Sequence, residues 1–279
     1  MSAARPFTLG LYLRNMGPQS DRATILAAAR AAEAAGIDDL WVADHIAIPP
    51  DNAEGSGGRY LDPLATLAFV AAATRRIGLG TGVLVLPYRP PLATAKWVAT
   101  IQELSEGRLL LGVGVGWMEA EFRAAGVPYA RRAPLTDQTL AFLERCFAAD
   151  EMEANGQRFL FKPRPARPPI IVGGAPPHVL RRVIRHGDGW MPVGGSAEAL
   201  RAPIAELRAM AAAAGKPPPV VTTMVTLPLD DPPRAADQAA ALRAVGVTGL
   251  VHAWRYPDAD AFARAAESLI THVRPGVAR

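Results

Sequence analysis

The amino-acid sequence predicts a single (β/α)8 barrel, an α/β fold, and three observations support this fold class. Short apolar stretches of strand character alternate with alanine-rich stretches of helical character along the chain. Eight strand–helix pairs can be assigned; this alternation is typical of a parallel sheet, which eight right-handed crossovers close into a barrel. The length of 279 residues is close to the roughly 250 residues of this architecture. We therefore expect residues 1–279 to form one domain.

The expected elements follow from periodicity and from signals at their ends. Strands are expected at 7–13, 39–43, 76–85, 108–113, 170–172, 189–193, 220–227 and 249–252. Helices are expected at 21–35, 64–73, 91–104, 118–149 with interruptions, 177–185, 197–213, 235–244 and 259–273. Asp21 and Asp62 are suited to begin the first two helices, and Gly36 to end the first. A doubly wound open sheet is the alternative, but no nucleotide-binding fingerprint follows the first strand.

Two segments depart from the regular alternation. A loop insertion near 46–60 contains Gly55, Gly57 and Gly58. It is either a lid over the barrel mouth or an ordinary surface loop. A short extra strand is expected near 157–162.

Composition and charge exclude several classes of protein. The formal net charge is +4, and the basic residues are spread along the chain, whereas a nucleic-acid-binding protein usually concentrates them. Cys146 is the single cysteine, so no disulfide forms within the chain, and we expect it to be a buried apolar residue. No apolar run approaches the roughly 20 residues of a membrane span, and the first residues lack the apolar core of a signal peptide. We expect a cytoplasmic protein without a metal site, since no His, Cys and carboxylate residues have metal-ligand spacing.

The candidate catalytic residues are His45 and Asp44, directly after the second strand. Catalytic side chains of a barrel lie at the carboxyl ends of its strands. A histidine there can donate or accept a proton near neutral pH, although a structural hydrogen bond is an equal interpretation. Asp44 would either orient the imidazole or bind loop amides. His252 and Trp254, which end the eighth strand, are further candidates for the substrate side of the site.

Glycine-rich strand ends indicate a site for a flat ligand with a phosphate. Glycines alternate with apolar residues in 77–85 and 108–117. Glycine inside a strand is costly unless a ligand or backbone comes close; the alternative is that small residues fit a crowded barrel interior. Gly173 and Gly174 lead from the fifth strand into a helix, and free amides at a helix start favour a phosphate.

These segments resemble the luciferase-like monooxygenase superfamily. The resemblance covers, in order, residues 39–45, 61–64, 74–83, 104–108, 112–117, 169–174 and 187–190. It implies a barrel that forms homodimers and binds a reduced flavin or deazaflavin at its mouth. It also implies a non-prolyl cis peptide at Gly82-Val83 behind the middle ring, a phosphate held by Gly173 and Gly174, and His45 as the active-site histidine. The residues expected to bind the cofactor are Gly82, Val83, Val85, Gly114, Val172, Gly173, Gly174, Met191, Pro192 and Val193.

Within the superfamily, the compact length and residues 112–117 are most similar to the branch that uses the deazaflavin coenzyme F420. One departure concerns the substrate. Trp117 stands where deazaflavin-dependent sugar-phosphate dehydrogenases have a catalytic glutamate, and Glu119 and Glu121 are out of register. An apolar wall at Trp117 suits a less polar organic substrate.

Three functional hypotheses follow from this resemblance. The first is hydride transfer between coenzyme F420 and a small organic substrate, with His45 as proton donor or acceptor. The second is an FMN-dependent monooxygenase that uses O2 and reduced flavin from a partner reductase. The third is a flavin-binding protein without catalytic activity.

Overall fold

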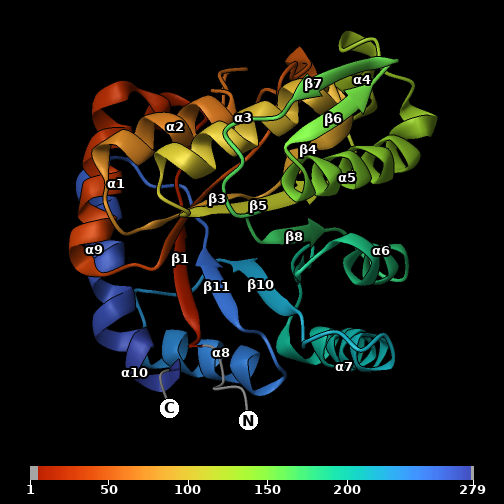
Figure 1. The fold of residues 1–279 in the computed structure, drawn as a ribbon. Helices are drawn as coiled ribbons and strands as arrows, with labels where there is room; N and C mark the ends of the chain where they lie inside the picture. The colour runs from red at the N-terminus through yellow and green to blue at the C-terminus, as the bar shows by residue number, and fades with distance from the viewer. Residues whose placement is uncertain (1–5, 278–279) are drawn as a thin grey trace.

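The structure, a computed structural model, describes residues 6–277 and forms a closed parallel barrel. Its strands are β1 (Thr8–Tyr12), β2 (Asp39–Val42), β3 (Gly78–Thr81), β4 (Leu84–Val85), β5 (Leu109–Gly114), β8 (Ile170–Gly173), β9 (Gly189–Met191), β10 (Val220–Val225) and β11 (Gly249–His252). Each pairs in parallel with its neighbours in the order β3-β2-β1-β11-β10-β9-β8-β5-β4. The pairing of β3 with β5 closes the ring, so the predicted (β/α)8 fold is confirmed (Figure 1).

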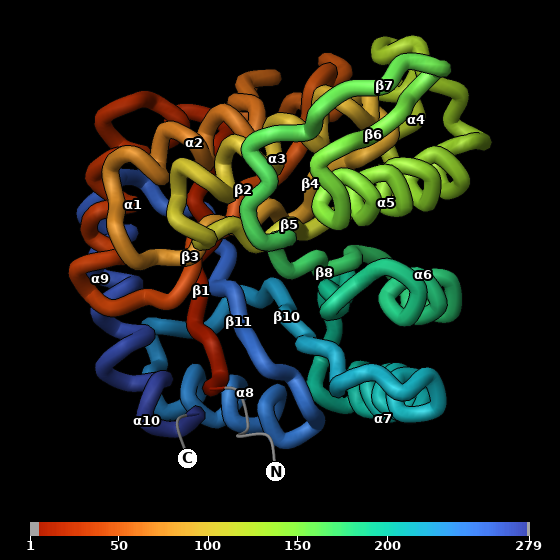
Figure 2. Tube along the Cα trace, viewed as in Figure 1, coloured from red at the N-terminus to blue at the C-terminus, as the bar shows by residue number. Residues whose placement is uncertain are grey.

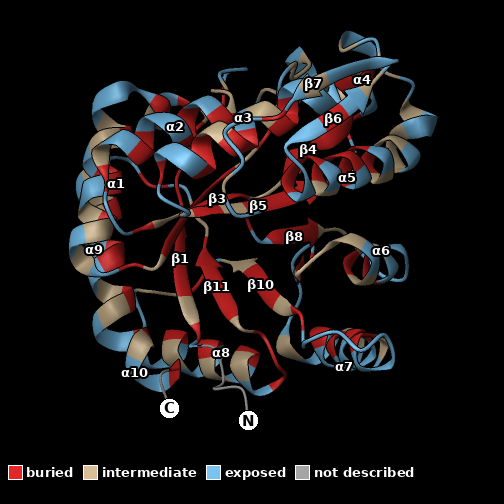
Figure 3. Ribbon diagram, in the orientation of Figure 1, coloured by how far each residue is buried: buried red, intermediate tan, exposed pale blue. Residues whose placement is uncertain are grey.

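Helices surround the barrel and bury their inner faces against it. They are α1 (Arg22–Ala35), α2 (Pro63–Ala73), α3 (Pro91–Leu104), α4 (Glu119–Ala124), α5 (Arg132–Ala148), α6 (His178–His186), α7 (Ala197–Ala213), α8 (Pro232–Ala244), α9 (Ala259–Ser268) and α10 (Arg274–Val277). The strands are buried along most of their length, whereas the helices are buried on one side and exposed on the other (Figure 3). The first and last strands, β1 and β11, lie side by side although they are separated by the whole chain (Figure 2).

The predicted helix ends are formed by the expected residues. The side chain of Asp21 accepts hydrogen bonds from the amides of Ala23 and Thr24, and Asp62 caps α2 through the amide of Ala65. Gly36 ends α1 in the left-handed conformation, with φ of 87°. Each cap satisfies amide or carbonyl groups that the helix itself leaves free.

The third barrel strand differs from its prediction. The prediction of one continuous strand over 76–85 is wrong. Two strands, β3 and β4, share this barrel position and are separated at Gly82-Val83. The peptide between these two residues is cis, as the resemblance implied.

The extra strand near 157–162 is half of a hairpin. β7 (Gln157–Leu160) pairs in antiparallel register with β6 (Glu151–Ala154), which was not predicted. Asn155 and Gly156 form the turn with positive φ values of 51° and 76°, which is the geometry of a tight hairpin turn.

The loop insertion at 46–60 is attached at its far end to the segment that follows β1. Tyr60 forms an isolated antiparallel bridge with Met16, and the amide of Gly17 donates to the carbonyl of Arg59. The guanidinium of Arg14 donates to the carbonyl of Gly55. The loop therefore lies beside the carboxyl end of β1, at the mouth of the barrel.

Two further expectations concern membrane spans and the single cysteine. Within residues 6–277, the apolar stretches of the helices fall short of what a membrane crossing requires. The thiol of Cys146 is fully buried on α5, and burial raises its pKa to about 11, which confirms the expected buried residue.

Candidate functional site

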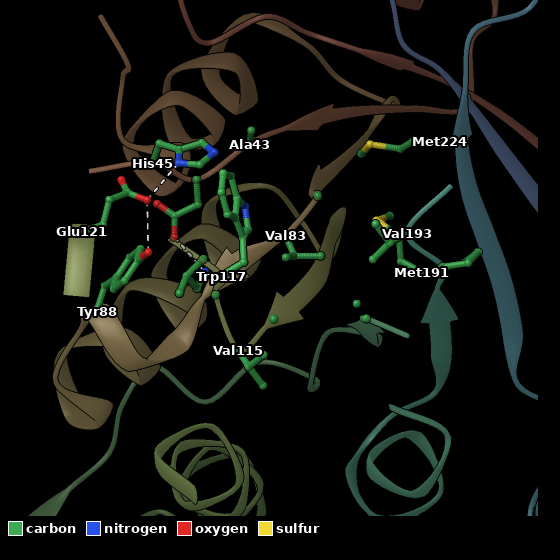
Figure 4. A pocket seen from close by; sticks show the side chains of 18 of the residues that line it. Ala43, His45, Val83, Tyr88, Val115, Trp117, Glu121, Met191, Val193 and Met224 are labelled. Atoms are coloured by element: carbon green, nitrogen blue, oxygen red, sulfur yellow. Dashed lines mark hydrogen bonds and ion pairs between the residues drawn. The ribbon is translucent and has the colours of Figure 1, made fainter. Parts of the chain in front are cut away.

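A cavity of about 420 Å3 lies at the carboxyl ends of the strands. Its walls come from β2, the junction of β3 and β4, β5, β8, β9 and β10, and most of its lining is apolar. Figure 4 shows His45, Glu121, Tyr88 and Trp117 at one end, Met191, Val193 and Met224 at the other, and Val83 between them. The predicted residues that line this cavity are Asp44, His45, Gly82, Val83, Val85, Gly114, Trp117, Gly173, Gly174, Met191, Pro192 and Val193.

His45 forms a hydrogen-bonded pair with Glu121. The imidazole Nδ1 lies 2.9 Å from Glu121 Oε2, and the His45 side chain retains 20% exposure toward the cavity while that of Glu121 retains 1%. The second ring nitrogen, Nε2, points away from Glu121 (Figure 4). The ring is enclosed by Tyr60 and Trp117, at centroid distances of 5.0 Å and 6.2 Å.

Glu121 is held by three further donors. Tyr88 donates its hydroxyl to Oε2 at 3.1 Å, and the amides of Ile46 and Ala47 donate to Oε1 at 2.7 Å and 3.0 Å. Burial opposes ionisation of this carboxyl, but the hydrogen bonds from His45 and the two amides outweigh it, so the pKa of Glu121 lies below its usual value. Glu121 is therefore ionised near neutral pH.

Asp44 supports the neighbouring backbone and does not orient the imidazole. Arg89 donates to both Asp44 oxygens at 2.6 Å and 2.9 Å, and the amide of Val85 donates at 2.8 Å. Arg89 also bonds Asp62 at the start of α2. Of the two roles that the sequence left open for Asp44, the structure supports amide binding; the orienting carboxylate is Glu121.

The glycine-rich strand ends serve two purposes. A Cβ added at Gly112 would overlap the carbonyl oxygen of Thr81, so this glycine fits a crowded barrel interior. At Gly114 and Gly173 an added Cβ would come within 2.5 Å and 2.7 Å of the two methyl groups of Val83. These two glycines therefore leave room for Val83, whose side chain forms the middle of the cavity wall. The resemblance implies that the middle ring of the cofactor lies against this part of the wall.

The predicted phosphate cradle is only partly as expected. Gly173 and Gly174 line the cavity, and Gly174 has φ of 142°, which favours glycine. However, the amide of Gly174 already donates to the carbonyl of Met191, and Pro176 and Pro177 have no N–H to donate. Gly173 and Gly174 therefore line the cavity as predicted, but neither the Gly174 amide nor the two prolines supply a free donor to a phosphate.

Three predicted site residues lie outside the cavity lining. His252 is buried, its Nδ1 accepts a hydrogen bond from the amide of Leu227 at 3.0 Å, and its ring packs on Trp254 at 4.4 Å. Burial lowers the pKa of His252 to about 4. Val172 is fully buried in the core. The assignment of His252 and Trp254 to the substrate side is therefore not supported, because these side chains pack behind the strand ends.

Sequence reasoning missed two polar residues of the site, Glu121 and Tyr88. Tyr88 ends a short 3-10 helix, Leu86–Tyr88, after β4, and Glu121 lies in the first turns of the six-residue helix α4 after β5. A carboxylate that follows a barrel strand within ten residues was the available signal for Glu121, but it could not name His45 as the partner 76 residues away.

Comparisons with known proteins identify the family of the chain. The family profile described as luciferase-like monooxygenase matches residues 8–273. An uncharacterized protein of Mycobacterium tuberculosis is 30% identical over 247 residues, which cover 82% of this chain and 84% of that protein. The F420-dependent hydroxymycolic acid dehydrogenase of the same species is 30% identical over 192 residues, which cover 66% of this chain and 52% of the dehydrogenase.

Two solved structures share the fold. One is an F420-dependent secondary alcohol dehydrogenase in complex with an F420-acetone adduct; its TM-score is 0.77 at 16% identity, with 98% of this chain and 99% of that chain covered. The other is the oxygenating constituent of 3,6-diketocamphane monooxygenase from Pseudomonas putida in complex with FMN; its TM-score is 0.78 at 15% identity, with 97% and 98% covered.

Proposed function

The chain belongs to the luciferase-like monooxygenase family, and we propose that it uses the deazaflavin coenzyme F420 to transfer a hydride to or from a small, largely apolar organic substrate. Membership of this family makes the chain an oxidoreductase. The choice of cofactor and reaction within the family is the proposal.

The observation that carries the proposal is the His45 imidazole at the cavity wall. Hydride transfer to a carbonyl carbon leaves negative charge on its oxygen, and the reverse reaction requires removal of a hydroxyl proton. When bound, the deazaflavin would supply or take up the hydride. His45, with Nδ1 bonded to Glu121 and Nε2 directed away from it, can hold the proton that the substrate oxygen gains or loses.

The cavity supports a substrate of low polarity. Trp117 is 67% exposed and lines the cavity beside His45, and Val115, Val193 and Met224 add apolar surface. The charged groups at this end are already paired, Glu121 with His45 and Asp44 with Arg89. A secondary alcohol or ketone fits such a lining better than a sugar phosphate, and two of the similar proteins are named as dehydrogenases that use F420.

A direct test compares the two cofactors. Purified protein is titrated with F420 and with FMN while fluorescence quenching is followed, and His45→Ala is titrated beside it. We expect binding of F420 that the variant retains, and reduction of F420 by members of a secondary-alcohol panel that the variant performs at least roughly 100-fold more slowly.

Other results would contradict the proposal. Binding of FMN but not F420, with oxygen consumption when reduced FMN is supplied, would assign a monooxygenase served by a partner reductase. Binding without turnover of any substrate by wild-type protein would favour a flavin-binding protein. Homodimer formation also stays a prediction, which sedimentation or light scattering of the purified protein would check.

A further inference from the structure

We propose that Glu121 is a positioning residue that keeps the proton of neutral His45 on Nδ1, so that Nε2 is the ring atom that exchanges protons with the substrate. The catalytic consequence rests on the proposed oxidoreductase function. The position of the proton does not, and it can be measured without any cofactor or substrate.

The position of the proton follows from the donors around one buried carboxylate. Oε1 accepts from two backbone amides, which cannot act as acceptors, and Oε2 accepts from the Tyr88 hydroxyl. An ionised carboxylate only accepts hydrogen bonds. Nδ1 at 2.9 Å from Oε2 must therefore donate, and a neutral imidazole with its proton on Nδ1 has an unprotonated Nε2.

The same carboxylate fixes the imidazole in space. The amides of Ile46 and Ala47 belong to the first residues of the 46–60 loop, and Tyr60 at the other end of this loop packs against the His45 ring at 5.0 Å. Glu121 thus binds the backbone on one side of His45 with one oxygen and the ring with the other. The imidazole has little freedom to turn Nδ1 toward the cavity.

The titratable groups near the pair leave this assignment intact. Tyr88 donates to Glu121, and burial beside that carboxylate raises its pKa, so the phenol stays protonated. The charge of Arg89 is taken up by Asp44 and Asp62. The ring of Tyr60 packs against that of His45 in a tilted arrangement, at an interplanar angle of 59°.

In the reaction, His45 would transfer one proton through Nε2. During oxidation of an alcohol, Nε2 would accept the hydroxyl proton as the carbonyl bond forms, and bound F420 would take up the hydride that leaves the carbon. The Nδ1 proton stays in place, and the imidazolium that results is paired with ionised Glu121. During reduction, Nε2 of the imidazolium would return its proton to the substrate oxygen, and the bound cofactor would supply the hydride to the carbon.

The first experiment locates the proton directly. Protein labelled with 15N at histidine is studied by long-range 1H–15N NMR, and loss of one signal set in His45→Gln assigns His45. We expect Nδ1–H in wild-type protein near pH 8. In Glu121→Gln the amide oxygen is needed by the Ile46 and Ala47 amides, so its NH2 faces Nδ1, and we expect the proton of His45 to move to Nε2.

Glu119→Gln provides the matched control. Glu119 lies on the same helix, is largely exposed and contacts Arg123, so its substitution should leave the His45 signals unchanged. A wild-type spectrum with the proton on Nε2 would overturn the proposal even if Glu121→Gln failed to fold. A folded Glu121→Gln that kept Nδ1–H would overturn it too.

The second experiment measures the consequence for catalysis. With F420 and an alcohol that the wild type oxidises, Glu121→Gln should lower kcat by roughly 30-fold or more and alter the pH profile of kcat, while the dissociation constant of F420 changes less than about twofold. Unchanged kcat and pH profile would restrict Glu121 to a structural role. If wild-type protein oxidises no alcohol, the proposed function fails, and the NMR result still decides the position of the proton.

Discussion

At the scale of single residues, Val83 determines the shape of the cavity. Its two methyl groups occupy the space left by the missing side chains of Gly114 and Gly173, which belong to β5 and β8. A valine that is packed from behind presents a rigid surface to a ring. The residues alone indicated a glycine wall for a flat ligand, and the resemblance placed the ring at Gly82-Val83. Neither could show that Gly114 and Gly173 leave room for the two methyl groups of Val83.

This packing predicts the effect of one added methyl group. In Gly114→Ala the Cβ would lie 2.5 Å from Val83 Cγ2, so Val83 must shift into the cavity. We expect F420 to bind at least roughly 10-fold more weakly, a loss of about 1.4 kcal/mol, with folding retained. The double variant Gly114→Ala/Val83→Ala should recover part of the affinity, and equal losses in both variants would refute the steric explanation. Fluorescence titration measures the dissociation constants.

At the scale of elements, the sequence predicted those with regular periodicity or a clear end signal. The caps at Asp21 and Asp62 depend on local hydrogen bonds, and the structure forms them. α4 has six residues and too few turns for periodicity to define it. β6 was overlooked although Asn155-Gly156 is a strong hairpin signal, because Glu151–Ala154 continues the composition of the preceding helix.

The end of β11 gives a prediction about pH and stability. His252 has a pKa of about 4 in the fold, below its ordinary value near 6.5, because it is buried and its Nδ1 accepts from Leu227. As the pH falls, His252 therefore takes up a proton in the unfolded chain before it does so in the folded chain. The neutral, buried His252 stabilises the fold fully above pH 6.5, and this contribution is lost as the pH falls toward 4. At about 1.4 kcal/mol per pKa unit, the loss is roughly 3 kcal/mol.

Urea unfolding between pH 4 and 7 checks this prediction. His252→Asn retains an acceptor near the Nδ1 position and does not titrate, so its free energy of unfolding should fall less steeply below pH 6.5 than that of the wild type. His178→Asn, which changes an exposed histidine on α6, should follow the wild-type curve. Parallel curves for wild type and His252→Asn would refute the argument.

At the scale of the whole molecule, barrel closure brings together residues that the sequence separates. The cavity lining extends from Ala43 to Met224 and comes from six barrel positions. Strand-end positions could be predicted because every barrel strand delivers its carboxyl end to one face. The pairing of His45 with Glu121, or the burial of His252 behind the strand ends, depends on side-chain directions and register, which periodicity does not determine.

A cavity assembled in this way predicts that the cofactor stabilises the barrel as a unit. Unfolding separates the six strand ends, so F420 should bind the folded chain alone and add RT ln(1 + [L]/Kd) to its stability, about 2.7 kcal/mol at 100 times Kd. We expect one cooperative urea transition that shifts to higher urea concentration with F420, and a smaller shift for Gly114→Ala at the same cofactor concentration. A shift that is equal in both proteins would mean that the ligand binds elsewhere on the molecule and not against Val83.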